Sequence, residues 1–229
     1  MQIARDGHQR YWTLDKFMGL AKASHAGPTL LVVCVSFFLA STQFSILSSL
    51  EVASAILAGQ FVVGWSNDLI DFDLDAQASR KKKPLVSGSI SPDLLKKSIV
   101  VAFGTALVLS LIGPLGLIGT AIHFLGLFSA TLYNLKLKRT VLSPLPYIIS
   151  FGAMPWAIYK ANGVNPPLWI YLGFALFSTA FHFLNVLKDL QWDLSQGILG
   201  APQRLGRVGS IGVAVVLIFL GAVGIVAGN

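Results

Sequence analysis

Seven long apolar segments, separated by polar stretches, run through this chain of 229 residues. They are Pro28–Leu47, Ser48–Trp65, Leu94–Gly113, Leu115–Tyr133, Pro144–Tyr159, Pro167–Leu187 and Val208–Gly228. An α-helix needs about 20 mostly apolar residues to cross the hydrocarbon core of a bilayer, so each segment predicts one membrane-spanning helix. We therefore predict an all-α fold, a multi-spanning transmembrane helical bundle of about seven helices.

The overall composition agrees with a membrane protein. Hydrophobic residues make up 54% of the chain and charged residues only 12%, which excludes an ordinary soluble domain. The single cysteine, Cys34, lies inside the first apolar segment, so no intrachain disulfide is expected. No segment resembles a nucleic-acid-binding module, so we expect membrane lipids and small molecules as partners, and no nucleic acid.

The distribution of basic residues predicts the orientation in the membrane. Of the 17 Lys and Arg residues, all but Lys160 lie in the N-terminal arm 1–27 or around the stretches that follow the second, fourth and sixth apolar segments. The positive-inside rule places these regions in the cytoplasm. We expect an integral membrane protein, in the plasma membrane if the cell is bacterial, with an amphipathic cytoplasmic arm lying along the membrane surface.

One polar pattern occurs twice, with an offset of 118 residues. Asn67, Asp71, Asp75, Pro84 and Gly88 recur as Asn185, Asp189, Asp193, Pro202 and Gly206. Each copy follows an apolar segment, so the pattern predicts two pseudo-repeats whose acidic ends face each other across a central cavity open to the cytoplasm. A single acidic turn would be typical of a solvated helix end, but such a cap has no reason to recur in register.

Carboxylates in both copies are spaced to share a helix face. Asp68, Asp71 and Asp75 lie at i, i+3 and i+7, and Asp189 and Asp193 lie at i and i+4. Like charges at this spacing destabilise a helix unless a cation neutralises them, and carboxylate oxygens suit Mg²⁺, which shares its ligand shell with phosphates. We predict a metal site formed by these five aspartates.

Basic and amide side chains near the acids predict a site for a diphosphate. Lys83 is the strongest candidate, because Pro84 favours an extended backbone that can aim its ammonium at a metal-bound anion. Further candidates are Asn67, Lys138, Arg139, Asn185, Lys188 and Arg204. The positive-inside rule alone also explains the basic members of this set.

Three side chains within or beside the apolar segments are candidates for contacts with a second ligand. His182 lies on the polar line of its segment, above Asn185, and Tyr133 and Tyr147 are comparable candidates. A histidine that a neighbouring helix satisfies is an equally good explanation of His182.

These motifs together resemble the UbiA superfamily of intramembrane prenyltransferases. The resemblance covers residues 23–206, and its motifs are Asn67-Asp68-x-x-Asp71-x-x-x-Asp75, Lys83-Pro84-Leu85-x-x-Gly88, Tyr133 to Arg139, and Lys188-Asp189-x-x-x-Asp193. It implies a helical bundle, commonly of nine spans, that binds a polyprenyl diphosphate through Mg²⁺. The chain departs from the pattern at Lys83, where Arg is usual, and at Trp192 and Gln196, where acids often stand. By this comparison the last two helices are missing, so we expect a transmembrane prenyltransferase domain over 28–229, truncated at its C-terminus.

The resemblance implies a Mg²⁺-dependent transferase of prenyl groups. It would move an isoprenoid chain from a polyprenyl diphosphate to an aromatic or other lipophilic acceptor, with Asp68, Asp71, Asp189 and Lys83 as catalytic residues. Two alternatives are an Asp-lined divalent cation transporter and an inactive membrane homologue. The acids at helix ends argue against the first, and the five aligned aspartates argue against the second. The sequence leaves open the acceptor, the prenyl length and the oligomeric state.

Overall fold

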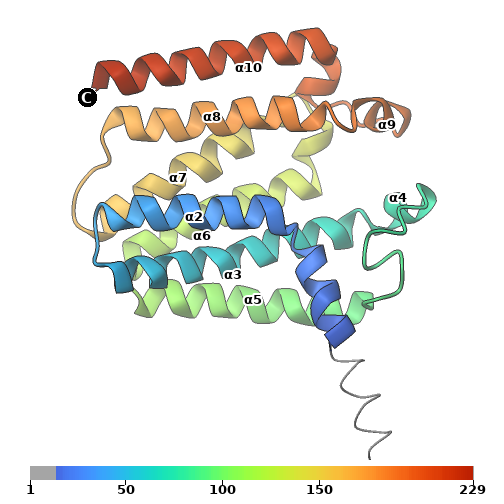
Figure 1. Ribbon diagram of the computed structural model, residues 1–229, viewed down its shortest axis with the longest axis horizontal. Coiled ribbons are helices and arrows are strands. Elements are labelled where there is room, and N and C mark those ends of the chain that lie inside the picture. The colour runs from blue at the N-terminus through green and yellow to red at the C-terminus, as the bar shows by residue number, and fades with distance from the viewer. Residues whose placement is uncertain (1–13, 229) are drawn as a thin grey trace, which may run out of the picture.

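The structure is a computed structural model, and it describes residues 14–228. Every regular element that it describes is a helix (Figure 1). In chain order these are the segment Leu14–Ala23, α2 (Ala26–Ser41), α3 (Ile46–Ile70), α4 (Phe72–Gln77), α5 (Pro92–Ile112), α6 (Gly116–Leu135), the 3₁₀ turn η1 (Leu137–Arg139), α7 (Leu145–Ala161), α8 (Leu168–Val186), α9 (Leu190–Ser195) and α10 (Ala201–Gly228). The predicted all-α fold is confirmed. Residues 1–13 of the predicted arm lie outside the described part.

Each of the seven apolar segments corresponds to one long helix, whose ends differ from the predicted ones by up to seven residues. Five helices in the described chain, α3, α5, α6, α8 and α10, are long and apolar enough to cross a membrane. Leu14–Ala23 and α2 form a sixth candidate if they are counted together, but a bend of 70° separates them. The seventh helix, α7, has 17 residues and contains Pro155, which removes one backbone hydrogen bond of the helix.

The long helices lie side by side, with α4 and α9 at the same end of the bundle (Figure 1). Helix α3 packs against α2, α5 and α6, while α7 packs against α6 and α8. Helix α10 packs against α8. Exposed apolar side chains, including Val100, Val101 and Ile112 of α5 and Val208 and Val226 of α10, cover the outer faces, as expected for helices in lipid.

The repeat in the sequence is also a repeat in the backbone. Helix α9 follows α8 at the same offset at which α4 follows α3, since Phe72–Gln77 corresponds to Leu190–Ser195. The two glycines of the pattern, Gly88 and Gly206, both have positive φ angles, of 76° and 67°. This backbone region strongly favours glycine, which explains why the pattern contains glycine at both positions. At Gly206 the change in direction kinks α10.

Close contact between α6 and α7 sets the geometry of the central region. A Cβ atom added to Gly119 would lie 2.9 Å from the Ala157 carbonyl oxygen, so this position requires glycine. About two turns further along α6, the Ser150 hydroxyl donates a hydrogen bond of 2.8 Å to the Gly126 carbonyl oxygen. Small residues let membrane helices approach closely, and here they bring the ends of α6 and α7 beside the cavity described next.

Candidate functional site

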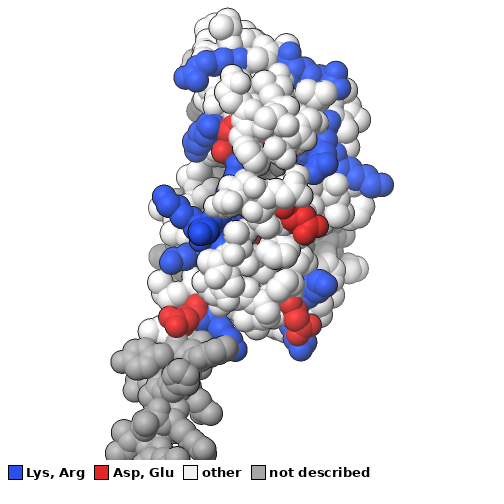
Figure 2. All heavy atoms as spheres, turned by 90° about the vertical axis from the view of Figure 1, so that its right-hand side faces the viewer, with Lys and Arg blue, Asp and Glu red and all other residues white. Residues whose placement is uncertain are grey.

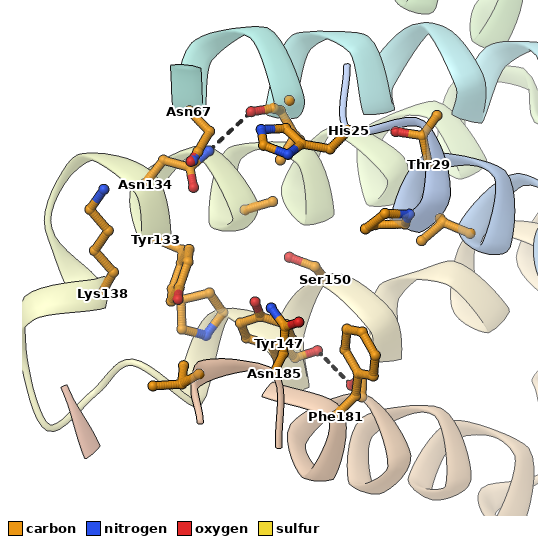
Figure 3. Close-up of a pocket in the computed structure, with 18 of the residues that line it drawn as sticks. His25, Thr29, Asn67, Tyr133, Asn134, Lys138, Tyr147, Ser150, Phe181 and Asn185 are labelled. Atoms are coloured by element: carbon orange, nitrogen blue, oxygen red, sulfur yellow. Dashed lines mark hydrogen bonds between the residues drawn. The ribbon is translucent and has the colours of Figure 1, made fainter. Parts of the chain in front are cut away.

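A cavity of about 870 Å³ lies between the two repeats, and residues of α2, α3, α4, α6, α7, α8 and α9 line it (Figure 3). Asp71 and Asp75 of the first repeat and Asp189 and Asp193 of the second repeat all belong to its wall. The rest of the wall is largely apolar, with Leu31, Val32, Val35, Phe151, Phe174 and Phe177 among its residues. The predicted arrangement of two acidic segments around one cavity is therefore present.

The end of α3 presents the first acidic segment. Helix α3 stops at Ile70, and Asp71 has φ −87° and ψ 0°, so α4 continues in a slightly different direction. Hydrogen bonds from Asp71 N to Asn67 O and from Asp75 N to Asp71 O keep Asn67, Asp71 and Asp75 one turn apart. The side-chain amide of Asn67 donates to Asp71 Oδ2 at 3.3 Å, and its carbonyl oxygen Oδ1 is buried without a hydrogen-bond partner among the described residues.

The end of α8 presents the second acidic segment in a similar way. Asp189 has φ −111° and ψ 9°, and Asp193 N donates to Asp189 O at 2.8 Å. The side-chain amide of Gln203, at the start of α10, donates to Asp193 Oδ2 at 2.8 Å. The pKa of Asp193 is raised above its ordinary value, mainly because the carboxyl is buried. The Gln203 hydrogen bond offsets part of this rise, and the Asp189 charge adds to it. Gln203 was not predicted, because its contact depends on how α10 returns to α9.

Arg80 joins the two repeats directly. Its guanidinium lies 3.4 Å from Asp75 Oδ1 and 3.5 Å from Asp189 Oδ1, and 5.5 Å from the centre of the Trp192 ring. Asp75 belongs to the first repeat, whereas Asp189 and Trp192 belong to the second. The two acidic segments are thus close enough for one side chain to bridge them. The basic sequence after α4 marks Arg80 as a cation, but nothing in the sequence identifies it as the bridge.

Lys83 is held between two carboxylates of the first repeat. Its ammonium lies 2.8 Å from Asp68 Oδ1 and 2.7 Å from Asp75 Oδ2. Burial alone would lower the pKa of Lys83, but the hydrogen bonds to Asp68 and Asp75 outweigh it and raise the pKa above its ordinary value. Lys83 is therefore a firmly charged cation in the cavity wall.

Asp68 occupies a different position from the other predicted metal ligands. It is 2% exposed, and it does not belong to the cavity wall. Besides Lys83, its Oδ1 atom contacts Nε2 of His25, at 3.1 Å. Helical spacing puts Asp68 on the same side of α3 as Asp71, but these two partners enclose its carboxylate. The prediction of Asp68 as a ligand facing the cavity is therefore not supported by its surroundings.

The remaining predicted diphosphate contacts divide into two groups. Lys138 lines the cavity and forms an ion pair with Asp71, and Asn185 lines the cavity opposite it. Arg139, Lys188 and Arg204 are not part of the wall. Lys188 donates to Asn185 Oδ1 at 3.0 Å, and Arg204 Nε donates to the Leu199 carbonyl oxygen at 2.9 Å. Figure 2 shows Lys and Arg side chains spread over this end of the molecule, as the positive-inside rule leads one to expect.

The donors in the cavity wall suit a hard divalent cation. They are carboxylate oxygens of Asp71, Asp75, Asp189 and Asp193 and the unpartnered amide oxygen of Asn67, which are ligands that Mg²⁺ accepts. Within residues 14–228, however, no three His, Cys, Asp or Glu side chains come close enough to hold a metal ion. The lysines and Arg80 pair with these carboxylates, so the chemistry of the site fits Mg²⁺ while the predicted ligand cluster is not assembled.

The three candidates for the acceptor site lie together, but only two of them reach the cavity. Tyr133 and Tyr147 line it, with ring centres 5.3 Å apart (Figure 3). The ring of His182 stacks on that of Tyr147, with ring centres 4.4 Å apart, and the residue is 1% exposed. Its Nε2 atom lies 3.1 Å from the hydroxyl oxygen of Ser143, just before α7. The neighbouring segment therefore satisfies one ring nitrogen of His182, whereas Nδ1 is buried without a hydrogen-bond partner among the described residues.

Known solved structures share this fold. A UbiA homolog from Archaeoglobus fulgidus bound to GPP and Mg²⁺ is similar with a TM-score of 0.78 and 13% identity, over 90% of this chain and 76% of that one. The apo structure of a UbiA homolog from Aeropyrum pernix K1 is similar with a TM-score of 0.71 and 18% identity, over 93% of this chain and 78% of that one.

The sequence also has a curated relative and a family match. The digeranylgeranylglyceryl phosphate synthase of Sulfolobus acidocaldarius is 27% identical over 165 residues, which are 69% of this chain. The matched region spans 56% of that relative, so the chain covers a little over half its length. Residues 29–229 match the UbiA prenyltransferase family. The chain therefore belongs to the UbiA prenyltransferase family.

Proposed function

We propose that this protein is a Mg²⁺-dependent prenyltransferase that acts within the membrane. It would transfer an isoprenoid chain from a polyprenyl diphosphate to an aromatic or other lipophilic acceptor. The observation that carries this proposal is the Arg80 bridge between Asp75 and Asp189. It holds two acidic helix ends across the mouth of a cavity whose remaining wall is largely apolar, and a charged group with a long apolar tail fits such a cavity.

The side chains that line the acidic end are suited to hold Mg²⁺ and a diphosphate. Asp71, Asp75, Asp189 and Asp193 would hold the metal directly or through water, and Asn67 would contribute its free amide oxygen. When bound, Mg²⁺ supplies Lewis acidity that stabilises the negative charge of the departing diphosphate.

Cations of the protein supply the other half of this stabilisation. Lys83, Lys138 and Arg80 line the same end of the cavity and would contact diphosphate oxygens as the allylic C–O bond breaks. The electron pair of that bond leaves with the diphosphate, and the allylic carbon is captured by a nucleophilic carbon or oxygen of the acceptor. The apolar wall, including Phe151, Phe174 and Phe177, would keep water away from the allylic cation.

The acceptor would lie against Tyr133 and Tyr147, which line the cavity between the acidic end and the apolar wall. The curated relative is named as a digeranylgeranylglyceryl phosphate synthase. We therefore propose a prenylated glyceryl phosphate as the first acceptor to test, followed by quinone-precursor aromatics. We also propose that the charged end with α4 and α9 faces the cytoplasm, because Lys and Arg gather there.

The proposal can be tested with the purified chain in lipid nanodiscs. We expect radiolabelled geranylgeranyl diphosphate and Mg²⁺ to yield a labelled lipid product with at least one acceptor of this panel, and EDTA to abolish the product. Asp189→Asn should remove the activity, since it replaces one carboxylate oxygen of the second repeat with an amide nitrogen. A chain that labels no acceptor of this panel would overturn the proposal, whether or not it binds geranylgeranyl diphosphate.

A further inference from the structure

The two repeats differ at three positions whose side chains touch one another. In the first repeat His25, Asp68 and Lys83 form a contiguous cluster. At the same offset of 118 residues, the second repeat has Ser143, Val186 and Ala201. The acids that line the cavity, by contrast, occur in both repeats. The presence of all three contacting side chains in one repeat, and of none in the other, indicates that they serve one purpose together.

Asp68 is built to hold two cationic or proton-donating groups. One oxygen, Oδ1, accepts from Lys83 Nζ at 2.8 Å and contacts His25 Nε2 at 3.1 Å. Its side chain is 2% exposed, so the carboxylate is directed at these partners and not at the cavity. Lys83 and His25 themselves both line the cavity. Asp68 therefore touches the site only through the two residues that it holds.

The backbone around His25 keeps its ring in place. His25 has φ 54° and ψ 59°, a left-handed conformation that residues other than glycine rarely adopt. It lies at the 70° bend between Leu14–Ala23 and α2, and the Thr29 hydroxyl fixes the bend by donating to Ser24 O at 2.7 Å. Because the carboxylate of Asp68 only accepts, Nε2 of His25 donates to it, and Nδ1 can donate to a diphosphate oxygen in the cavity when the ring carries a second proton.

We infer that Asp68 is a positioning residue that holds Lys83 and His25 at the rim of the cavity, where both contact the diphosphate, and that it is not a metal ligand. This inference rests on the proposed function. The metal would then be held by the acids that the two repeats share. The diphosphate would lean towards the first repeat, since only that repeat supplies this pair of side chains.

The test measures metal binding and diphosphate binding separately, in nanodiscs. The probe is geranylgeranyl thiodiphosphate, which resists cleavage, and Mn²⁺ binding is followed by electron paramagnetic resonance in the presence of excess probe. We expect Asp68→Asn to weaken probe binding about 10-fold, because it removes the charge that orients Lys83 and His25, and to change Mn²⁺ affinity less than about 2-fold. The matched control, Asp71→Asn, should weaken Mn²⁺ binding at least about 10-fold.

A double-mutant cycle tests whether Asp68 acts through Lys83. Lys83→Gln combined with Asp68→Asn should lose less probe affinity than the two single losses added together, since the second change then misplaces only His25. Additive losses, or a loss of Mn²⁺ affinity in Asp68→Asn equal to that in Asp71→Asn, would overturn the inference.

Two further outcomes are distinguishable. If Asp68→Asn does not fold, His25→Gln and Lys83→Gln replace it, and both must weaken probe binding with Mn²⁺ affinity kept; failure of either refutes the inference. If the wild type binds the probe but prenylates no acceptor, the proposed function fails, whereas the binding measurements still decide the role of Asp68.

Discussion

The hydroxyl of Ser143 joins three segments of the bundle, and its removal gives a prediction with a definite size. It accepts a hydrogen bond of 3.0 Å from Ala201 N at the start of α10, and it lies 3.1 Å from His182 Nε2 in α8. Ser143 is completely buried, so Ser143→Ala leaves both groups without partner or water. A buried group left unsatisfied costs about 1–3 kcal/mol. With two such groups, Ala201 N and His182 Nε2, we expect Ser143→Ala to lower the free energy of unfolding by roughly 2–6 kcal/mol.

Thermal unfolding in nanodiscs, followed by circular dichroism, measures this loss. For a chain of this size 1 kcal/mol corresponds to about 2–4 °C in Tm, so the expected decrease is roughly 4–24 °C. Ser54→Ala is the matched control, because the Ser54 hydroxyl is exposed on α3 and bonds only to Leu50 O of its own helix. A decrease for Ser143→Ala no larger than that of the control would refute the idea that this hydroxyl couples α7, α8 and α10.

Three further predictions concern the repeats. Asp71→Asn and Asp189→Asn, one from each repeat, should each reduce the rate of prenyl transfer by roughly 100-fold or more, because both acids line the proposed metal site. The helical circular dichroism should stay unchanged. Activity close to that of the wild type in either variant would contradict a shared site. Arg80→Gln removes the cation between the repeats. In steady-state kinetics we expect it to raise the KM for geranylgeranyl diphosphate more than it lowers kcat. An unchanged KM would mean that Arg80 does not contact the substrate. Gly206→Ala should lower the free energy of unfolding by about 1–3 kcal/mol, because φ 67° and ψ −173° are essentially restricted to glycine. Gly212→Ala in the same helix is the control and should not lower Tm, because an added Cβ there meets no atom within 4 Å.

Hydropathy predicted the long helices because their apolar segments are close to a membrane in length. Each predicted segment corresponds to one helix, and the start of α5 at Pro92 differs from the predicted start, Leu94, by two residues. The break between α3 and α4 at Asp71 was not predicted. No proline or glycine marks it, and the hydrogen bonds from Asp71 N to Asn67 O and from Asp75 N to Asp71 O are those of a continuous helix. Local sequence therefore carries no sign of the change in direction.

The repeat predicted which acids line the cavity, but not which cations meet them. Asp71, Asp75, Asp189 and Asp193 face one cavity, because duplicated segments fold alike. The contact of Asp68 with His25 links residues 43 apart, and that of Arg80 with Asp189 links residues 109 apart. Such pairings depend on how loops of different repeats pack, and neither periodicity nor composition contains that information.

The ion pairs of Arg80 with Asp75 and Asp189 have a consequence for ligand binding. At the position equivalent to Arg80 the second repeat has Ile198, so a single guanidinium, without a twin, spans the pseudo-twofold axis. The guanidinium offsets part of the negative charge of Asp75 and Asp189. Under the proposed function, a metal diphosphate would displace it from these carboxylates and offer it phosphate oxygens as new partners, so binding would amount to an exchange of ion-pair partners.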